Sequence, residues 1–336
     1  MDHHKILQAL ADTGQAVCQR VQESLRTQTI EQLSAASSRA AADTIYQIDK
    51  NVEDLIVARL QQAALEAGGI VLIAEGIGED EKVVLPAGMP EEQAKIRLLA
   101  DPVDGTRGIM YNKRSAFFLA GAAPNHGKNT RLSDIEVAVM VELPTTRCYL
   151  SDTLYAIKGQ GAKGFTTNLF TGEQTPLSPR PSAATSLLGG FAQIARFFPP
   201  GRDVLARIEE SMLQRLYPNA DLSQTILFED QYISSGGQVY EMLMGHDRFV
   251  ADIRTLLFRK LVKEGGAKGH TCHPYDLAAH LIGTEAGLVI CSPRGQPLDA
   301  PFDTTSDVDW LACANQRIFD HVYPALTASI KEAGLI

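Results

Sequence analysis

Cysteine is scarce in this chain, which has 5 cysteines among 336 residues. They lie far apart, are odd in number and form no C-x-x-C pair, so neither a disulfide framework nor a zinc ribbon is expected. This usage fits a reducing compartment best, and we expect a cytoplasmic protein.

Long apolar runs and basic blocks are also missing. No run approaches the length needed to cross a bilayer, and residues 1–5 lack the apolar core of a signal peptide. The net charge is -9, and a field of this sign repels nucleic acid and anionic membranes. We therefore expect neither a nucleic-acid polymer nor a membrane as a partner, and a phosphorylated substrate would need local cations.

The two halves of the chain differ in pattern. With 45% hydrophobic residues the chain can bury a large core. Helices at 4–27 and from Asp49 onward precede a series of extended runs, whereas helices and strands alternate beyond a proline-rich stretch at 176–182. We predict an α+β domain over 1–178 with an antiparallel sheet, and an α/β domain over 179–336. Predicted elements of the second half are strands at 186–191, 248–252, 288–291 and 310–314, and helices at 203–216, 238–244, 276–286 and 316–331.

Carboxylates follow two apolar strands. The predicted strand at 70–74 ends at Glu75, and the apolar run at 96–100 leads into DPVDGT at 101–106. Pro102 cannot donate to a sheet ladder, so the strand is expected to end there. Asp101, Asp104 and the Val103 carbonyl offer hard oxygen ligands to Mg²⁺. The free N–H groups of Gly105 and Thr106 suit an anion, although the same residues are also common in plain surface turns.

Two further acids stand at predicted helix starts. Asp49 is expected at the N-cap of the second helix, and Asp276 at the start of the helix at 276–286. Capping alone would explain either residue.

The two segments DPVDGT and YDLAA, at 101–106 and 275–279, resemble the two signatures of the inositol monophosphatase family. These enzymes are the lithium-sensitive, Mg²⁺-dependent sugar and nucleotide phosphatases, in a superfamily with fructose-1,6-bisphosphatase and 3′(2′),5′-bisphosphate nucleotidase. The likeness extends over nearly the whole chain and includes Asp49 and Glu75. It implies a layered αβαβα sandwich and a phosphoric monoester hydrolase that acts on a small phosphorylated metabolite. The family is often dimeric, so a homodimer is one of the expected states.

The resemblance also implies residue roles and two or three Mg²⁺ ions per site. The implied metal ligands are Glu75, Asp101, Val103, Asp104 and Asp276, the phosphate-binding pair is Gly105 and Thr106, and the groups that position water and accept its proton are Asp49, Glu75 and Thr106. Metals of this kind neutralise phosphoryl oxygens and lower the pKa of a bound water.

Two departures from the family pattern leave the substrate open. Gly76 follows Glu75 where the family has a second Glu, so a water partner is missing or is supplied by Glu79. The stretch 254–271 looks inserted relative to the shorter inositol phosphatases. Asp252 is the nearest acid to the family's substrate-facing position. The basic residues of the insert would favour a second anionic group or form only a solvated helix face; they are Arg254, Arg259, Lys260, Lys263 and Lys268.

Two functions of other kinds compete. In haloacid-dehalogenase-type phosphatases the first Asp of a similar motif is a covalent nucleophile, which would assign that role to Asp101. The second competing function is that of a non-catalytic module, which only binds metal and phosphate. Among substrates, inositol phosphates, fructose 1,6-bisphosphate and 3′-phosphoadenosine 5′-phosphate stay open, with Arg107 after Thr106 leaning towards nucleotides.

Overall fold

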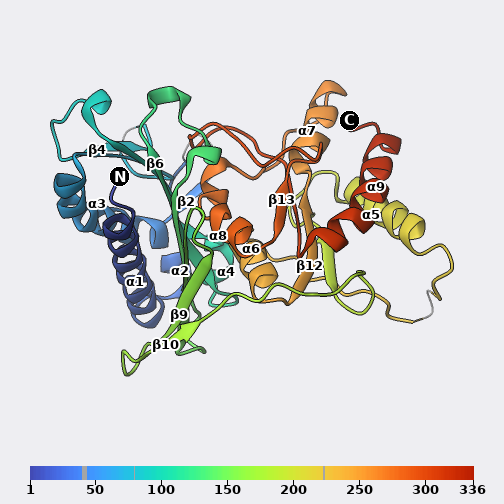
Figure 1. The fold of residues 1–336 in the computed structure, drawn as a ribbon, viewed down its shortest axis with the longest axis horizontal. Coiled ribbons are helices and arrows are strands. Elements are labelled where there is room, and N and C mark those ends of the chain that lie inside the picture. The colour runs from blue at the N-terminus through green and yellow to red at the C-terminus, as the bar shows by residue number, and fades with distance from the viewer. Residues whose placement is uncertain (40–43, 79, 222–223) are drawn as a thin grey trace.

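The computed structural model describes residues 1–39, 44–78, 80–221 and 224–336. An eight-stranded and a four-stranded sheet alternate with three layers of helices, so that the molecule is a helix, sheet, helix, sheet, helix sandwich (Figure 1). The layered αβαβα architecture that the resemblance implies is therefore confirmed.

An eight-stranded sheet forms the second layer, in the order β10-β9-β8-β7-β6-β5-β3-β4. Its strands are β3 (Ile70–Ala74), β4 (Lys82–Leu85), β5 (Ile96–Asp104), β6 (Ala116–Pro124), β7 (Val137–Leu143), β8 (Leu150–Ile157), β9 (Ala162–Asn168) and β10 (Gln174–Leu177). All neighbours are antiparallel except β3 and β5, which run parallel with Ala74 beside Ala100. The residues that follow these two strands therefore emerge at the same edge of the sheet.

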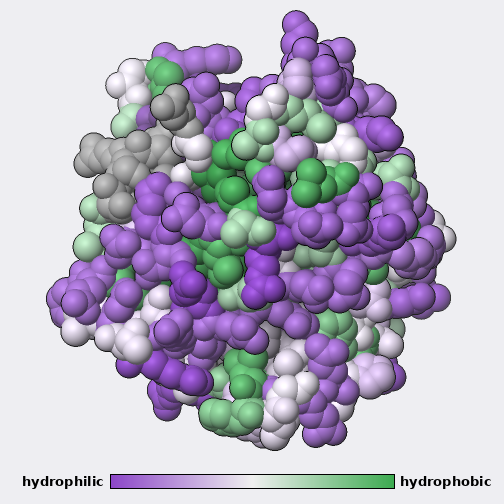
Figure 2. Space-filling view, turned by 90° about the vertical axis from the view of Figure 1, so that its left-hand side faces the viewer, coloured by the Kyte–Doolittle hydropathy of each residue, from purple (hydrophilic) through white to green (hydrophobic). Residues whose placement is uncertain are grey.

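Two long helices, α1 (His3–Thr27) and α3 (Gln47–Ala67), cover the outer face of this sheet (Figure 1). Successive residues of β5 point to opposite faces: Leu98 packs with the helices, whereas Leu99 faces the middle of the molecule. The exposed side of this helical layer is mostly hydrophilic (Figure 2), as the amphipathic pattern at 4–27 predicts. Between α1 and α3 lie α2 (Ile30–Leu33) and the short strands β1 (Ala36–Arg39) and β2 (Thr44–Tyr46).

The middle layer contains α6 (Ser235–Leu243), the 3-10 turn η4 (Pro274–Leu277) and α8 (His280–Glu285). A four-stranded sheet follows in the order β11-β12-β14-β13, formed by β11 (Phe191–Ile194), β12 (Asp247–Asp252), β13 (Val289–Cys291) and β14 (Trp310–Cys313). Its outer face is covered by α5 (Arg202–Leu216), α7 (Arg254–Lys263) and α9 (Gln316–Glu332). Shorter elements are η1 (Glu91–Gln93), α4 (Thr106–Ile109), η2 (Gly127–Asn129) and η3 (Leu132–Asp134). No helix of the described part has both the length and the apolarity required to span a membrane.

Three element predictions were wrong. The strand expected at 186–191 is irregular, and β11 begins only at Phe191. The single helix expected at 276–286 is divided into the 3-10 turn η4 and the helix α8, with Ala278 and Ala279 between them. Strand β5 continues past Pro102 to Asp104 instead of ending there. The large sheet ends at Leu177, before the small sheet begins, and the division into domains at 178/179 stays a prediction.

The large sheet and the middle layer approach each other very closely at Gly121 in β6. A Cβ atom there would lie 2.3 Å from the Ala278 carbonyl oxygen and 2.6 Å from Ile135 Cδ1. Such distances are too short for any real contact, and a backbone oxygen cannot rotate away. Gly121 is therefore required for η4 to lie against the sheet.

We predict that Gly121→Ala lowers the free energy of unfolding by about 2 kcal/mol, measured by urea denaturation, because overpacking forces η4 away from β6. In the control Gly108→Ala the new methyl would meet its nearest atom at 3.5 Å, an ordinary contact, and stability should be kept. Equal stabilities of the two variants would contradict this account of the packing.

Candidate metal centre

Carboxylates from separate segments meet at the edge where β3 and β5 end. Asp101, Asp104 and Asp276 each place one oxygen so that the three atoms lie within 4.8 Å of one another. Glu75, directly after β3, lines the same cleft. The structure thus brings together all four acidic side chains predicted as metal ligands.

A β-bulge aims Asp101 and Asp104 at the same place. Asp101 pairs with Leu119 and Asp104 with Phe117, so one extra residue of β5 stands against β6. Three residues apart in a regular strand, the two side chains would point to opposite faces, and the extra residue removes this alternation. Pro102 lies inside the bulge, where no ladder donor is lost. The Asp101 Oδ1 atom accepts a hydrogen bond from the Val103 N–H at 3.0 Å.

Helix α6 holds the Asp104 carboxylate. Its Oδ2 atom accepts from the Ser234 hydroxyl at 2.7 Å and from the Gly236 N–H at 2.6 Å. Ser234 is also the N-cap of α6 and accepts from the Gly237 N–H. This contact could not be predicted from the sequence, since a Ser at position 234 can indicate a helix start but not the residue that it touches.

Asp49 and Asp276 are held by the same kind of capping hydrogen bond. Each is the third residue of its helix, and one oxygen accepts from the backbone N–H three residues earlier: Tyr46 N to Asp49 at 2.8 Å, His273 N to Asp276 at 2.5 Å. The expectation that Asp49 is the N-cap was wrong, because Tyr46 occupies that position. The capping bond fixes the direction of each carboxylate.

The turn after β5 brings Thr106 onto Asp49. The Thr106 hydroxyl lies 3.0 Å from Asp49 Oδ1 and 2.8 Å from the Val103 carbonyl oxygen, and its single proton serves one of them at a time. Gly105 has φ +94°, and a Cβ atom would lie 3.0 Å from Ser234 Cβ. Only glycine takes this conformation readily, so the close approach depends on it.

Burial and mutual repulsion disfavour the ionised form of the carboxylates in this cleft. Burial, followed by the carboxylates of Asp104, Glu75 and Asp276, raises the pKa of Asp101 well above its ordinary value. Burial and then Asp276 raise the pKa of Asp104 to about 8. A carboxylate oxygen set of this kind fits a hard divalent cation such as Mg²⁺, which would relieve the repulsion.

The cleft has a second wall of different character. It includes Arg107, Phe197, Phe198, Arg254 and His270. Arginine and aromatic side chains thus line the same cleft as the carboxylates.

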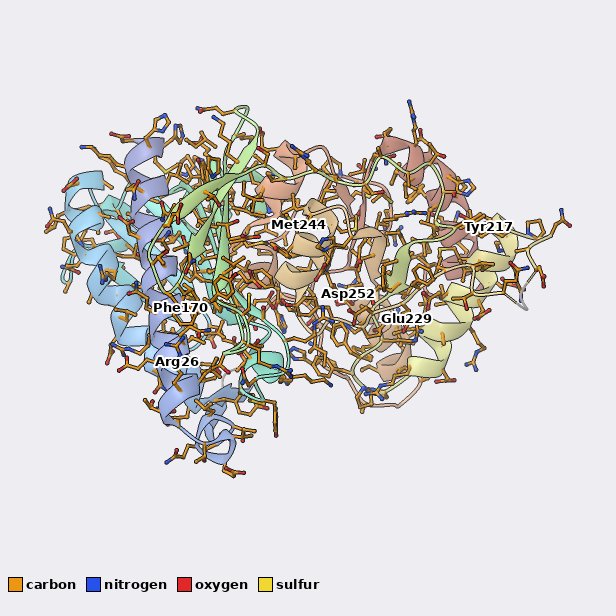
Figure 3. All side chains as sticks on the ribbon, turned by 90° about the horizontal axis from the view of Figure 1, so that it is seen from below. Arg26, Phe170, Tyr217, Glu229, Met244 and Asp252 are labelled. Carbon is orange, nitrogen blue, oxygen red and sulfur yellow. The ribbon has the colours of Figure 1, made fainter. Side chains whose placement is uncertain are left out.

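Asp252, the predicted substrate acid, does not line the cleft. Only 1% of its surface is exposed, and both oxygens accept from Arg254. Figure 3 shows it in the interior of the molecule, away from its outline. Lys268 is paired with Asp307 at 2.8 Å, and neither Lys263 nor Lys268 borders the cleft. Glu79, the suggested water partner, lies outside the described residues.

Solved structures share this fold. Holo fructose-1,6-bisphosphatase from Leishmania major matches with a TM-score of 0.69 and 14% identity, over 98% of this chain and 96% of that chain. The SuhB extragenic suppressor protein from Bartonella henselae matches with a TM-score of 0.65 and 16% identity, over 96% and 98%. Inositol monophosphatase from Anabaena matches with a TM-score of 0.60 and 13% identity, over 99% and 97%. No protein-family model and no curated protein matches the sequence.

We predict that Asp104→Asn raises the stability of the metal-free protein at pH 8 by on the order of 1 kcal/mol. The folded-state pKa of Asp104 lies above its ordinary 3.8, so the stability that this group contributes is lost as the pH rises from about 4 through about 8. Asn has no such charge and can still accept from Ser234.

Thermal unfolding with and without Mg²⁺ tests this, with the exposed Asp12→Asn as control. The wild type and the control should gain stability from Mg²⁺, whereas Asp104→Asn should gain little. If Asp104→Asn were less stable than the wild type without metal, the charge repulsion described above would be refuted.

Proposed function

We propose that this protein is a Mg²⁺-dependent phosphatase that hydrolyses a phosphate monoester of a small metabolite. The observation that carries the proposal is the convergence of Asp101, Asp104 and Asp276 with Glu75 in one cleft, beside the turn at Gly105. Two independent features support it. The carboxylates come from separate elements held by their own hydrogen bonds, and the fold is shared with a fructose-1,6-bisphosphatase and an inositol monophosphatase.

One set of groups in the cleft would bind the metal ions. Asp101, Asp104, Asp276, Glu75 and the Val103 carbonyl would hold the ions, two or three per site. Bound Mg²⁺ would neutralise phosphoryl charge and make a bound water more acidic.

The remaining groups bind phosphate and water. The backbone N–H groups of Gly105 and Thr106 would donate to the phosphate. The Thr106 hydroxyl, which contacts Asp49, would orient the attacking water, and Glu75 would accept its proton. Because the Thr106 hydroxyl has one proton, its contact with Asp49 leaves its lone pairs available to accept from that water.

Several finer properties stay predictions. A 3′(2′),5′-bisphosphate nucleotidase or a fructose-1,6-bisphosphatase activity is the alternative within the same superfamily. Lithium sensitivity, a cytoplasmic location and a homodimer follow only from the resemblance or from composition. Phosphate release from a panel of phosphorylated metabolites, assayed side by side, separates the substrates.

We predict that Asp101→Asn or Asp276→Asn lowers kcat by about a thousandfold or more, because each removes a carboxylate that clamps the ions of the transition state. The measurement is phosphate release with and without Mg²⁺, with Asp12→Asn as the control that keeps full activity. Circular dichroism verifies that both variants fold.

Each outcome has a clear meaning. If a folded Asp101→Asn variant kept its turnover, the proposed metal site would be excluded as the active site. A phosphoryl group trapped on Asp101 would instead favour the covalent mechanism. Absence of phosphate release from every substrate of the panel, with Mg²⁺ bound, would favour the non-catalytic module.

A further inference from the structure

Arg254 is an almost fully buried guanidinium at the wall of the cleft. Its side chain is 3% exposed and borders the same cleft as Asp101 and Asp276. It is the first residue of α7, which follows strand β12 of the small sheet. A charged group is rarely buried to this degree without a defined set of partners.

The hydrogen bonds of Arg254 use only part of its donors. Nε donates to Asp252 Oδ1 at 2.8 Å, one terminal nitrogen donates to Asp252 Oδ2 at 2.5 Å, and the other donates to the His270 carbonyl oxygen at 3.0 Å. A guanidinium carries five N–H bonds. Two of them, one on each terminal nitrogen, therefore have no partner within the part of the chain that the structure describes.

Aromatic rings hold the guanidinium plane in place. Its central carbon lies 4.4 Å from the centre of the Phe197 ring and 5.6 Å from that of Phe198. The Arg107 guanidinium lies 5.1 Å from the same Phe198 ring, so two cations flank one aromatic side chain. Arg107, Arg254 and Phe198 line the same cleft as the carboxylates that would hold the ions.

We propose that Arg254 is a specificity-determining residue that binds a second anionic group of the substrate, a phosphate or a carboxylate, while the scissile phosphate occupies the metal centre. The inference rests on the proposed function and names the class of substrate. Asp252 fixes the guanidinium from behind, and the two remaining N–H bonds serve the ligand.

The chemistry of the wall favours an anion over a neutral sugar. Asp252 is buried, does not line the cleft and is paired with Arg254 through both oxygens, so it is not placed to accept from a sugar hydroxyl there. What the pair presents to the cleft is a set of donors on a planar cation, the geometry that suits the oxygens of a phosphate or carboxylate. The sequence pointed to Asp252 here, and the pairing with Arg254 reverses the sign of the group that the ligand meets.

Arg254→Lys tests the inference, because it keeps a cation beside Asp252 and removes the extra donors. A second variant, Asp252→Asn with Arg254→Gln, removes the ion pair as a unit, so that no buried charge is left alone. The control is Arg207→Lys, an exposed arginine of α5 that is paired with Asp203 at 2.7 Å and lies outside the cleft.

Two matched substrate pairs separate the sources of the anion. Fructose 1,6-bisphosphate is compared with fructose 1-phosphate, and 2-phosphoglycerate with glycerol 2-phosphate. In the wild type kcat/KM should be higher for the bis-anionic member of at least one pair. Arg254→Lys and the double variant should raise KM for that member about tenfold or more, with kcat and the mono-anionic partner changed less than twofold. Arg207→Lys should change neither.

Binding of the four compounds, followed by titration calorimetry with Ca²⁺ present, gives a readout that does not need turnover. If no ester is hydrolysed but Arg254→Lys loses affinity for a bis-anionic compound, the proposed function fails and this inference stands. Equal losses on both members of a pair, or no preference of the wild type in either assay, would overturn the inference and leave the phosphatase proposal intact.

Discussion

Repulsion between buried carboxylates is the constraint on which this structure depends. If all three carboxylates were ionised, oxygens within 4.8 Å of one another would repel by about 3 kcal/mol per pair at an effective dielectric constant of about 20. A stability of 5–15 kcal/mol, typical of a folded domain, would not tolerate several such pairs without compensation. Part of this compensation comes from hydrogen bonds within the protein. Ser234 and Gly236 donate to Asp104, and backbone N–H groups donate to Asp49 and Asp276. A bound divalent cation would supply the rest, which links the stability of this region to its function.

The layered fold brings together the segments that carry these carboxylates. Parallel pairing of β3 with β5 brings Glu75 next to the DPVDGT segment, and the bulge in β5 turns both of its aspartates to one side. The close contact at Gly121 lets η4 carry Asp276 to the same point. The four acids thus come from three separate segments, the end of β3, β5 and η4, so that no single segment could form the site alone.

Much of this could be predicted from sequence, because strand ends and acid positions are local features. The αβαβα fold and the segments that bear Glu75, Asp101 and Asp276 came from apolar runs, turn residues and a family resemblance. The bulge was missed, since Pro102 reads as a strand end when the pairing of β5 with β6 is unknown. The burial of Asp252 was missed because it depends on Arg254, two residues away, whose side chain turns back onto it. Side-chain contacts leave no periodic signal, whether they join near neighbours such as Arg254 and Asp252 or distant residues such as Ser234 and Asp104.

The central claim is that the carboxylate cluster is a divalent-cation site, and metal location tests it most directly. Crystals grown with Mn²⁺, a hard cation of similar ligand preference to Mg²⁺, give anomalous diffraction at the manganese edge. The account predicts at least one anomalous peak within about 2.5 Å of oxygens from Asp101 and from Asp104 or Asp276, and its loss in Asp101→Asn. Absence of anomalous density at these three residues, with Mn²⁺ in millimolar excess, would contradict it.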